Sequence, residues 1–193
     1  GIVFFFISMK FLDDINKLSR YNRTTKMDSK LRYLINHCDV EILSYSSKTL
    51  DFEEKNHPLE ALNDIDYHMS YKRHYIKGSD NEFEFVYHEE VLFPPMQIPV
   101  KNMFKGFVLE FDTLLDMEER VFKNHHLLKE MFEVSYIYVI NHKISFYIPQ
   151  ECYIENALKN KEYKEEVSKM VLSIKKLIKI KKELETVLKE ELV

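Results

Sequence analysis

Apolar residues recur at helical spacing through the last part of the chain, from Lys161 to Val193. They follow in steps of four and three, at Tyr163, Val167, Met170, Ile174, Leu177, Leu184 and Leu188. Neither glycine nor proline interrupts this stretch. The spacing predicts one long amphipathic helix with a broad apolar face.

A helix from Lys161 to Val193 would be about 50 Å long, which exceeds the width of a compact domain of this size. We therefore divide the chain into a globular domain, residues 1–160, and a C-terminal helix, residues 161–193, that is packed on it and partly projecting. The half from Tyr163 to Ile178 is expected to pack on the domain. The second half is expected to offer its apolar residues to a second copy or another protein. These interface candidates are Leu184, Val187, Leu188 and Leu192.

Alternating apolar and polar residues predict β-strands upstream of this helix. The clearest run, Glu82 to His88, places Phe83, Phe85 and Tyr87 toward a core, and Glu82, Glu84 and His88 toward water. A matching strand before it would present Met69, Tyr71, Arg73 and Tyr75 on its core side. Two hairpins follow from these patterns, 68–77 with 81–90 and 134–140 with 144–148. Residues 107–111 read as a further strand, and 40–46 with 49–54 as a third hairpin.

Apolar residues at helical spacing predict further helices over residues 11–18, 25–35, 56–65 and 114–132. Three prolines in residues 94–100 predict a loop there. Most strands are joined by turns too short for parallel crossovers. The sequence thus predicts an α+β fold in which an antiparallel sheet, built from hairpins, packs against helices.

Composition narrows the classes of function. The chain has 193 residues, 28 basic and 32 acidic, so its net charge of −4 gives no global attraction to nucleic acid or anionic membranes. Its three glycines cannot form the glycine-rich loops that cradle phosphates. The two cysteines, Cys38 and Cys152, form no CxxC pair, which fits a reducing compartment. We expect a cytoplasmic protein, and the apolar runs are too short to span a membrane.

One cluster of side chains has the chemistry of a metal site. On a helix over residues 114–132, Glu119, His126 and Glu130 would lie within about 40° of one another, and His126 and Glu130 are four residues apart. A metal ion would need ligands from a second element as well. The available residues are His57, His68, His74, His88 and Glu89. A solvated helix face explains the same pattern, so a divalent metal is a possible cofactor and none is required.

Other charged segments suggest weaker alternatives. Two carboxylates and a lysine in the segment Asp51 to Lys55 could hold Mg²⁺ for phosphodiester hydrolysis. The segment Tyr71 to Tyr75 places aromatic rings next to basic residues, as stacking surfaces for bases do. The lysines at 175–182 scatter around the helix axis, so a nucleic-acid partner is not indicated.

Every catalytic motif considered is missing, whereas apolar helix surface is in excess. The sequence therefore favours a non-enzymatic interaction or regulatory module that self-associates or binds a protein partner through the C-terminal helix. The alternative is a metal-dependent hydrolase acting on nucleic acid or nucleotides.

Overall fold

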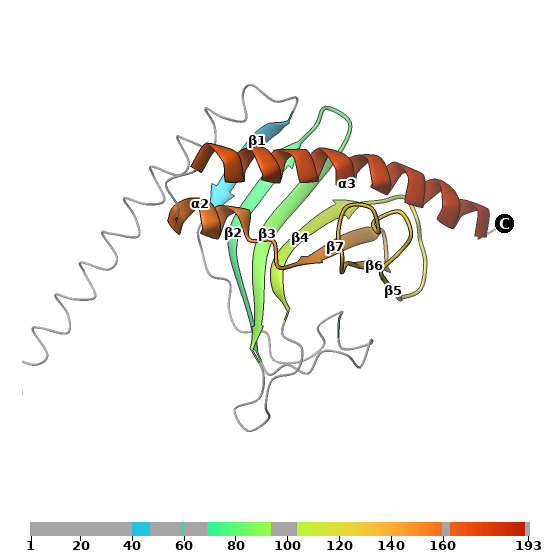
Figure 1. Cartoon of the computed structure of the whole chain (residues 1–193). Helices are drawn as coiled ribbons and strands as arrows, with labels where there is room; N and C mark the ends of the chain where they lie inside the picture. Colours follow the sequence, from blue (N-terminus) through green and yellow to red (C-terminus); the bar gives the residue numbers. More distant parts are fainter. Residues whose placement is uncertain (1–39, 47–58, 60–68, 94–103, 160–162, 192–193) are drawn as a thin grey trace, which may run out of the picture.

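A computed structural model describes residues 40–46, 59, 69–93, 104–159 and 163–191 (Figure 1). Its centre is one antiparallel sheet of seven strands in the order β1-β2-β3-β4-β7-β6-β5. The strands are β1 (Glu41–Ser46), β2 (Met69–Ser79), β3 (Glu84–Phe93), β4 (Lys105–Asp112), β5 (Arg120–Lys123), β6 (Tyr136–Ile140) and β7 (Lys143–Pro149). The predicted α+β class is confirmed, as are the hairpins formed by β2 with β3 and by β6 with β7.

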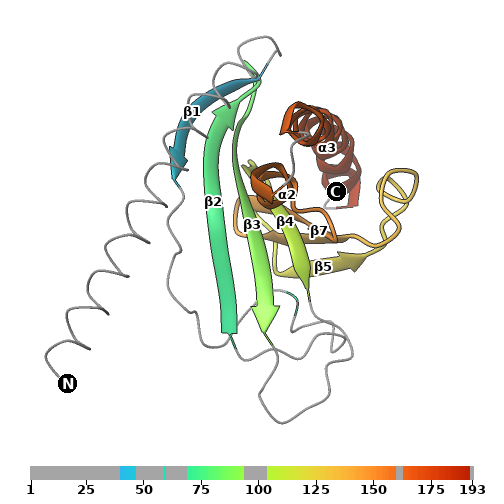
Figure 2. The ribbon, with the colours of Figure 1, turned by 60° about the vertical axis from the view of Figure 1, so that its left-hand side comes forward.

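Two helices at the end of the chain cover one face of this sheet, as Figure 2 shows with α3 seen nearly end-on. They are α2 (Tyr153–Lys159) and α3 (Tyr163–Glu191). The odd-numbered residues of β3 and β4 point toward them, and Phe85, Tyr87 and Phe107 are among the most buried side chains. Their contacts with the inner side of α3 make the main core.

The inner side of α3 is buried along nearly its whole length. Val167, Met170, Ile174 and Leu177 lie in the main core, and Leu184 and Leu188 lie there too, at 0% and 1% exposed. The expectation that the second half of the helix offers these two leucines to a partner is therefore wrong. Val187 is half-buried, and Leu192 lies outside the described residues.

The opposite face of the sheet is also buried in part. Six residues pack there in a smaller cluster: Leu59, Leu92, Phe104, Val108, Tyr136 and Tyr147. His88 points to this face and is only 2% exposed, with the Tyr75 ring stacked on it at 5.1 Å between centroids. The alternation predicted correctly which side His88 occupies, but that side does not face water.

A β-bulge interrupts the pairing of β2 with β3 between Arg73 and Ile76. His74, in the bulge, has a φ of 57°, a left-handed conformation that is uncommon for a residue other than glycine. The extra residue reverses the alternation, so Arg73 lies on the helix-covered face and Tyr75 on the other. Arg73 and Tyr75, which the prediction put in one row, therefore lie on opposite faces of the sheet.

The helix predicted over residues 114–132 is absent from this segment, all of which the structure describes. The segment is an extended loop, then strand β5, then turns around residues 124–132. A helix would place Leu114 on its core side, yet this leucine is 91% exposed, whereas Leu115 and Met117 are buried. Hydrogen bonds from the turn between β6 and β7 to the carbonyls of Leu115 and Met117 hold the segment extended.

Several predicted elements lie outside the described residues. These are the helices at 11–18, 25–35 and 56–65 apart from Leu59, the strand at 49–54 and the loop at 94–100. The strand predicted at 40–46 is β1, which pairs with β2 at one edge of the sheet.

Candidate functional site

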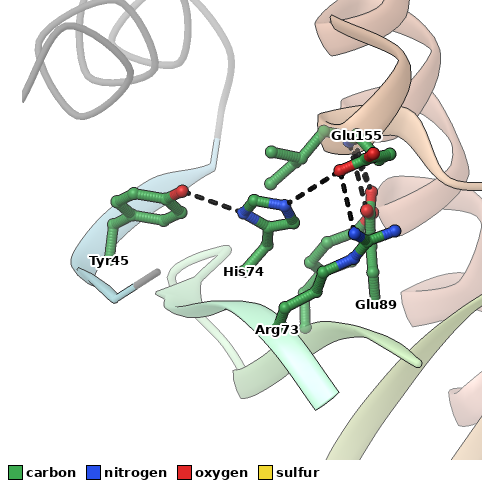
Figure 3. A network of polar contacts seen from close by, with 7 residues as sticks. Tyr45, Arg73, His74, Glu89 and Glu155 are labelled. Atoms are coloured by element: carbon green, nitrogen blue, oxygen red, sulfur yellow. Dashed lines mark hydrogen bonds and ion pairs between the residues drawn. The ribbon is translucent and has the colours of Figure 1, made fainter. Parts of the chain in front are cut away.

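A network of charged side chains lies where β1, β2 and β3 meet the start of α2 (Figure 3). At its centre is Glu89 of β3, which is fully buried. The Tyr87 hydroxyl donates to Glu89 Oε1 over 3.0 Å, and the backbone N–H of Ile154 donates to the same oxygen over 2.6 Å. The N–H of Glu155 donates to Oε2 over 3.1 Å. The Glu89 carboxylate thus accepts hydrogen bonds from two backbone N–H groups in the first turn of α2, where N–H groups have no partner within the helix.

The second half of the network is centred on Glu155 of α2. Arg73 Nη1 lies 3.0 Å from Glu155 Oε2, and His74 Nε2 lies 3.7 Å from the same oxygen. On the other side of the imidazole, His74 Nδ1 is 3.0 Å from the Tyr45 hydroxyl. One carboxylate therefore links α2 to two neighbouring residues of β2, and His74 extends the link to β1.

Burial shifts the two titrating groups of the network in opposite directions. Burial raises the pKa of Glu89 to about 7, although its hydrogen-bond donors and the Arg73 guanidinium favour the charged form. Burial, followed by the charge of Arg73, lowers the pKa of His74 to about 4, although Glu155 opposes the shift. At neutral pH the imidazole is therefore uncharged.

The arrangement of Tyr45, His74 and Glu155 has the order hydroxyl, imidazole, carboxylate that nucleophilic enzymes use. An imidazole with a pKa near 4 is, however, a weak base at neutral pH and a poor acceptor for a phenol proton. Cys152, beside the network, is buried, and burial raises the pKa of its thiol to about 12, which keeps it protonated. The geometry of the network favours a structural role, in which it holds α2 against the sheet, over a catalytic role.

Sequence reasoning identified only part of this network. His74 and Glu89 were candidate metal ligands, and Arg73 belonged to the aromatic and basic segment from Tyr71 to Tyr75. The roles of Tyr45 and Glu155 were missed, because they depend on contacts between distant elements. The available signal was Glu89 itself, a carboxylate on the apolar side of an alternating strand.

The predicted metal residues are not brought together. Without the helix at 114–132, His126 and Glu130 lose their spacing of one turn. Glu119 acts instead as a hydrogen-bond partner of Tyr138. Among the residues that the structure describes, no group of three or more His, Cys, Asp or Glu side chains is placed to hold a metal ion.

The outward side of α3 is a second candidate site. Leu172 lies there with 55% of its surface exposed, and Lys176 and Lys179 are exposed one and two turns further along. Lys181, on the inner side, is buried and paired with Glu185, and Lys169 is paired with Glu165 and Glu166, so these two lysines are not counted toward the charge of this side. This outward side, around Leu172, Lys176 and Lys179, is called the basic face below.

Neither family models, nor curated proteins, nor solved structures give a match to the chain. In the described part of the chain, no helix is long and apolar enough to cross a membrane. Function is therefore inferred from the geometry.

Proposed function

We propose that the protein is a non-enzymatic interaction module that binds a protein partner through the basic face of α3. The observation that carries this proposal is the position of Leu172. A half-exposed leucine followed along the helix by the exposed lysines Lys176 and Lys179 combines an apolar anchor with a charged edge, as in protein-binding surfaces.

Two further observations support the proposal. The inner side of α3 is taken up by the chain's own core, which fixes the helix and leaves the outward side to present a rigid surface. The charged network at α2 joins that helix to the strands of the sheet, so it supports a scaffold role.

A binding measurement with a synthetic probe tests the proposal. The probe is a short peptide of repeated Leu-Glu-Glu-Glu units, compared with polyglutamate of equal charge. We expect the leucine-containing peptide to bind more tightly, because it adds apolar contact to charge attraction. Lys176→Glu combined with Lys179→Glu should abolish binding, and Leu172→Ser should reduce it to the level of polyglutamate. Lys164→Glu combined with Lys189→Glu is the matched control, with the same change of charge at exposed positions elsewhere on α3.

A DNA duplex and vesicles of anionic lipid serve as alternative partners in the same assay. If either binds as tightly as the peptide and is lost with the same variants, the face recognises polyanions in general and the proposal of a protein partner is wrong. An equal loss of binding in the control variant would also contradict it.

The hydrolase alternative has no specific observation in its favour among the described residues, and Asp51 to Lys55 lie outside them. A cytoplasmic location remains part of the proposal. It is supported by Cys152, which is a free thiol buried in the fold.

A further inference from the structure

The loop between β4 and β5 presents an unusual row of side chains. From Thr113 to Glu118 buried and exposed residues alternate, so the segment is extended and has an inner and an outer side. The outer side carries Leu114, which is 91% exposed, followed by Asp116 and Glu118. The three residues Leu114, Asp116 and Glu118 are called the acidic row below.

The loop is firmly anchored. The Thr113 hydroxyl hydrogen-bonds to Glu185 of α3, and its N–H donates to the carbonyl of His142 over 2.8 Å. The N–H groups of His142 and Asn141 donate to the carbonyls of Leu115 and Met117 over 3.1 Å and 3.3 Å. Leu115 and Met117 fill the core below. Exposure of Leu114 is therefore a fixed property of the surface, and ordering the loop adds little cost when a partner binds.

The acidic row and the basic face are complementary in charge and in order. The row reads leucine, acid, acid over Leu114, Asp116 and Glu118. The outward side of α3 reads leucine, lysine, lysine over Leu172, Lys176 and Lys179. The first set spans about 13 Å as an extended segment. The second spans about 10 Å along the helix, a difference that flexible lysine side chains can bridge.

Three large apolar side chains are exposed in the described part of the chain. Leu114 and Leu172 are the two most exposed, and Leu43 is the third. Carboxylates follow Leu114 at Asp116 and Glu118, and exposed lysines follow Leu172 at Lys176 and Lys179, so the two leucines have neighbours of opposite charge. Apolar contact at the centre with ion pairs around it is the usual arrangement of a specific protein interface.

We propose that the occupant of the basic face is the acidic row of a second copy of this chain. The contact joins two different surfaces, so a pair of copies retains one free basic face on one copy and one free acidic row on the other. Association then continues from copy to copy, either into a closed ring or into an open chain. This inference rests on the proposed function, because it names the partner of the same face.

The experiment uses two charge-reversed variants of the full chain. Variant one carries Lys176→Glu and Lys179→Glu, which removes the basic face and keeps the acidic row. Variant two carries Asp116→Lys and Glu118→Lys, which removes the acidic row and keeps the basic face. Sedimentation velocity is measured from about 10 µM to about 500 µM, the range suited to weak contacts.

We expect the mean mass of the unmodified chain to rise with concentration at about 50 mM NaCl and to fall back at about 500 mM, where charges are screened. Each variant alone should remain monomeric, with the dissociation constant raised at least about tenfold. An equimolar mixture of the two variants should associate again, because the intact acidic row of variant one meets the intact basic face of variant two, and the two reversed surfaces are also opposite in charge. Leu114→Ser should weaken association without changing the net charge.

Three results would overturn the inference. They are an unmodified chain that stays monomeric at every concentration, a mixture of the two variants that fails to associate, and an equal loss of association in the Lys164→Glu and Lys189→Glu control. If the chain stays monomeric while its basic face still binds the Leu-Glu-Glu-Glu peptide, the self-association is wrong and the proposed function stands. If neither is observed, both fail.

Discussion

His74 and Glu89 lie on the same face of neighbouring strands, on either side of Arg73 and Glu155, and their pKa values are displaced in opposite senses. Burial lowers the pKa of His74 from 6.5 to about 4 and raises that of Glu89 from 4.5 to about 7. Other charged or titrating groups that face them are Tyr45, Arg73, Tyr87, Cys152, Tyr153 and Glu155. The two displacements make opposite contributions to the pH dependence of stability.

The first prediction concerns Glu89→Gln. In the unmodified chain, the unfolded state releases the Glu89 proton near pH 4.5 and the folded state near pH 7, so this group's contribution to stability falls as the pH rises between them. The loss amounts to about 3 kcal/mol. In the variant, only the His74 contribution remains of the two. Between pH 4 and pH 6.5 the imidazole is charged in the unfolded state and uncharged in the folded state, so the free energy of unfolding should rise with pH over this range. Urea denaturation at a series of pH values measures this, and a profile parallel to that of the unmodified chain would refute it.

The second prediction is the mirror image. His74→Asn removes the imidazole and introduces a side chain that tolerates the left-handed backbone. The folded state disfavours the charged imidazole, so its contribution to stability is lost as the pH falls from 6.5 to 4. Without it, stability should fall as the pH rises from 4.5 to 7. The double variant should again show only a shallow slope, like the unmodified chain. The prediction fails if both single variants slope in the same direction.

The third prediction concerns the backbone contact at Gly106. A Cβ atom there would lie 2.0 Å from the carbonyl oxygen of Ile148, in the paired strand β7. Gly106→Ala should lower the free energy of unfolding by at least about 3 kcal/mol, because the ladder must move apart. Gly78→Ala is the comparison and should cost less, since the nearest backbone atom to a Cβ there, the Glu41 carbonyl oxygen, is 2.9 Å away, although the buried Phe85 ring at 2.4 Å must also shift. Chemical denaturation showing equal losses would contradict this explanation.

The fourth prediction separates the two sides of α3. Leu184→Ala should cost about 2–5 kcal/mol of stability, because the side chain is fully buried in the chain's own core. Leu172→Ala should cost less than about 0.5 kcal/mol, because that side chain faces outward. Thermal denaturation at low protein concentration measures both. Similar losses would mean that the outward side is also packed.

Local alternation predicted most of the sheet. The β2–β3 hairpin was visible because polar and apolar residues alternate through β3. The β6–β7 hairpin was visible because two apolar runs of strand-forming residues flank a turn at Asn141 and His142, which both have positive φ. Strand order could not be predicted in the same way. The pairing of β4 with β7 depends on contacts over more than thirty residues, and nothing in either strand specifies its neighbour.

The helix predicted from Leu114 to Phe132 was wrong for a physical reason. Its apolar residues fit a period of 3.6, but the first six residues also fit a period of two, and tertiary hydrogen bonds from the β6–β7 turn select the extended form. The candidate metal site depended on that helix. The contacts of Glu155 with Arg73 and His74 were equally hidden, since a one-residue bulge decides which side of β2 each residue occupies.

The covering of the sheet by α3 also affects how the chain emerges during synthesis. Phe85 and Phe107 belong to strands made well before Leu184 and Leu188, which help to cover that face and are made last among the described elements. A ribosome adds roughly 5–20 residues per second, so this aromatic surface stays open for several seconds before the helix can close over it. In that interval the nascent chain is a substrate for chaperones that hold apolar surface, and slowing translation before Tyr163 would lengthen its exposure.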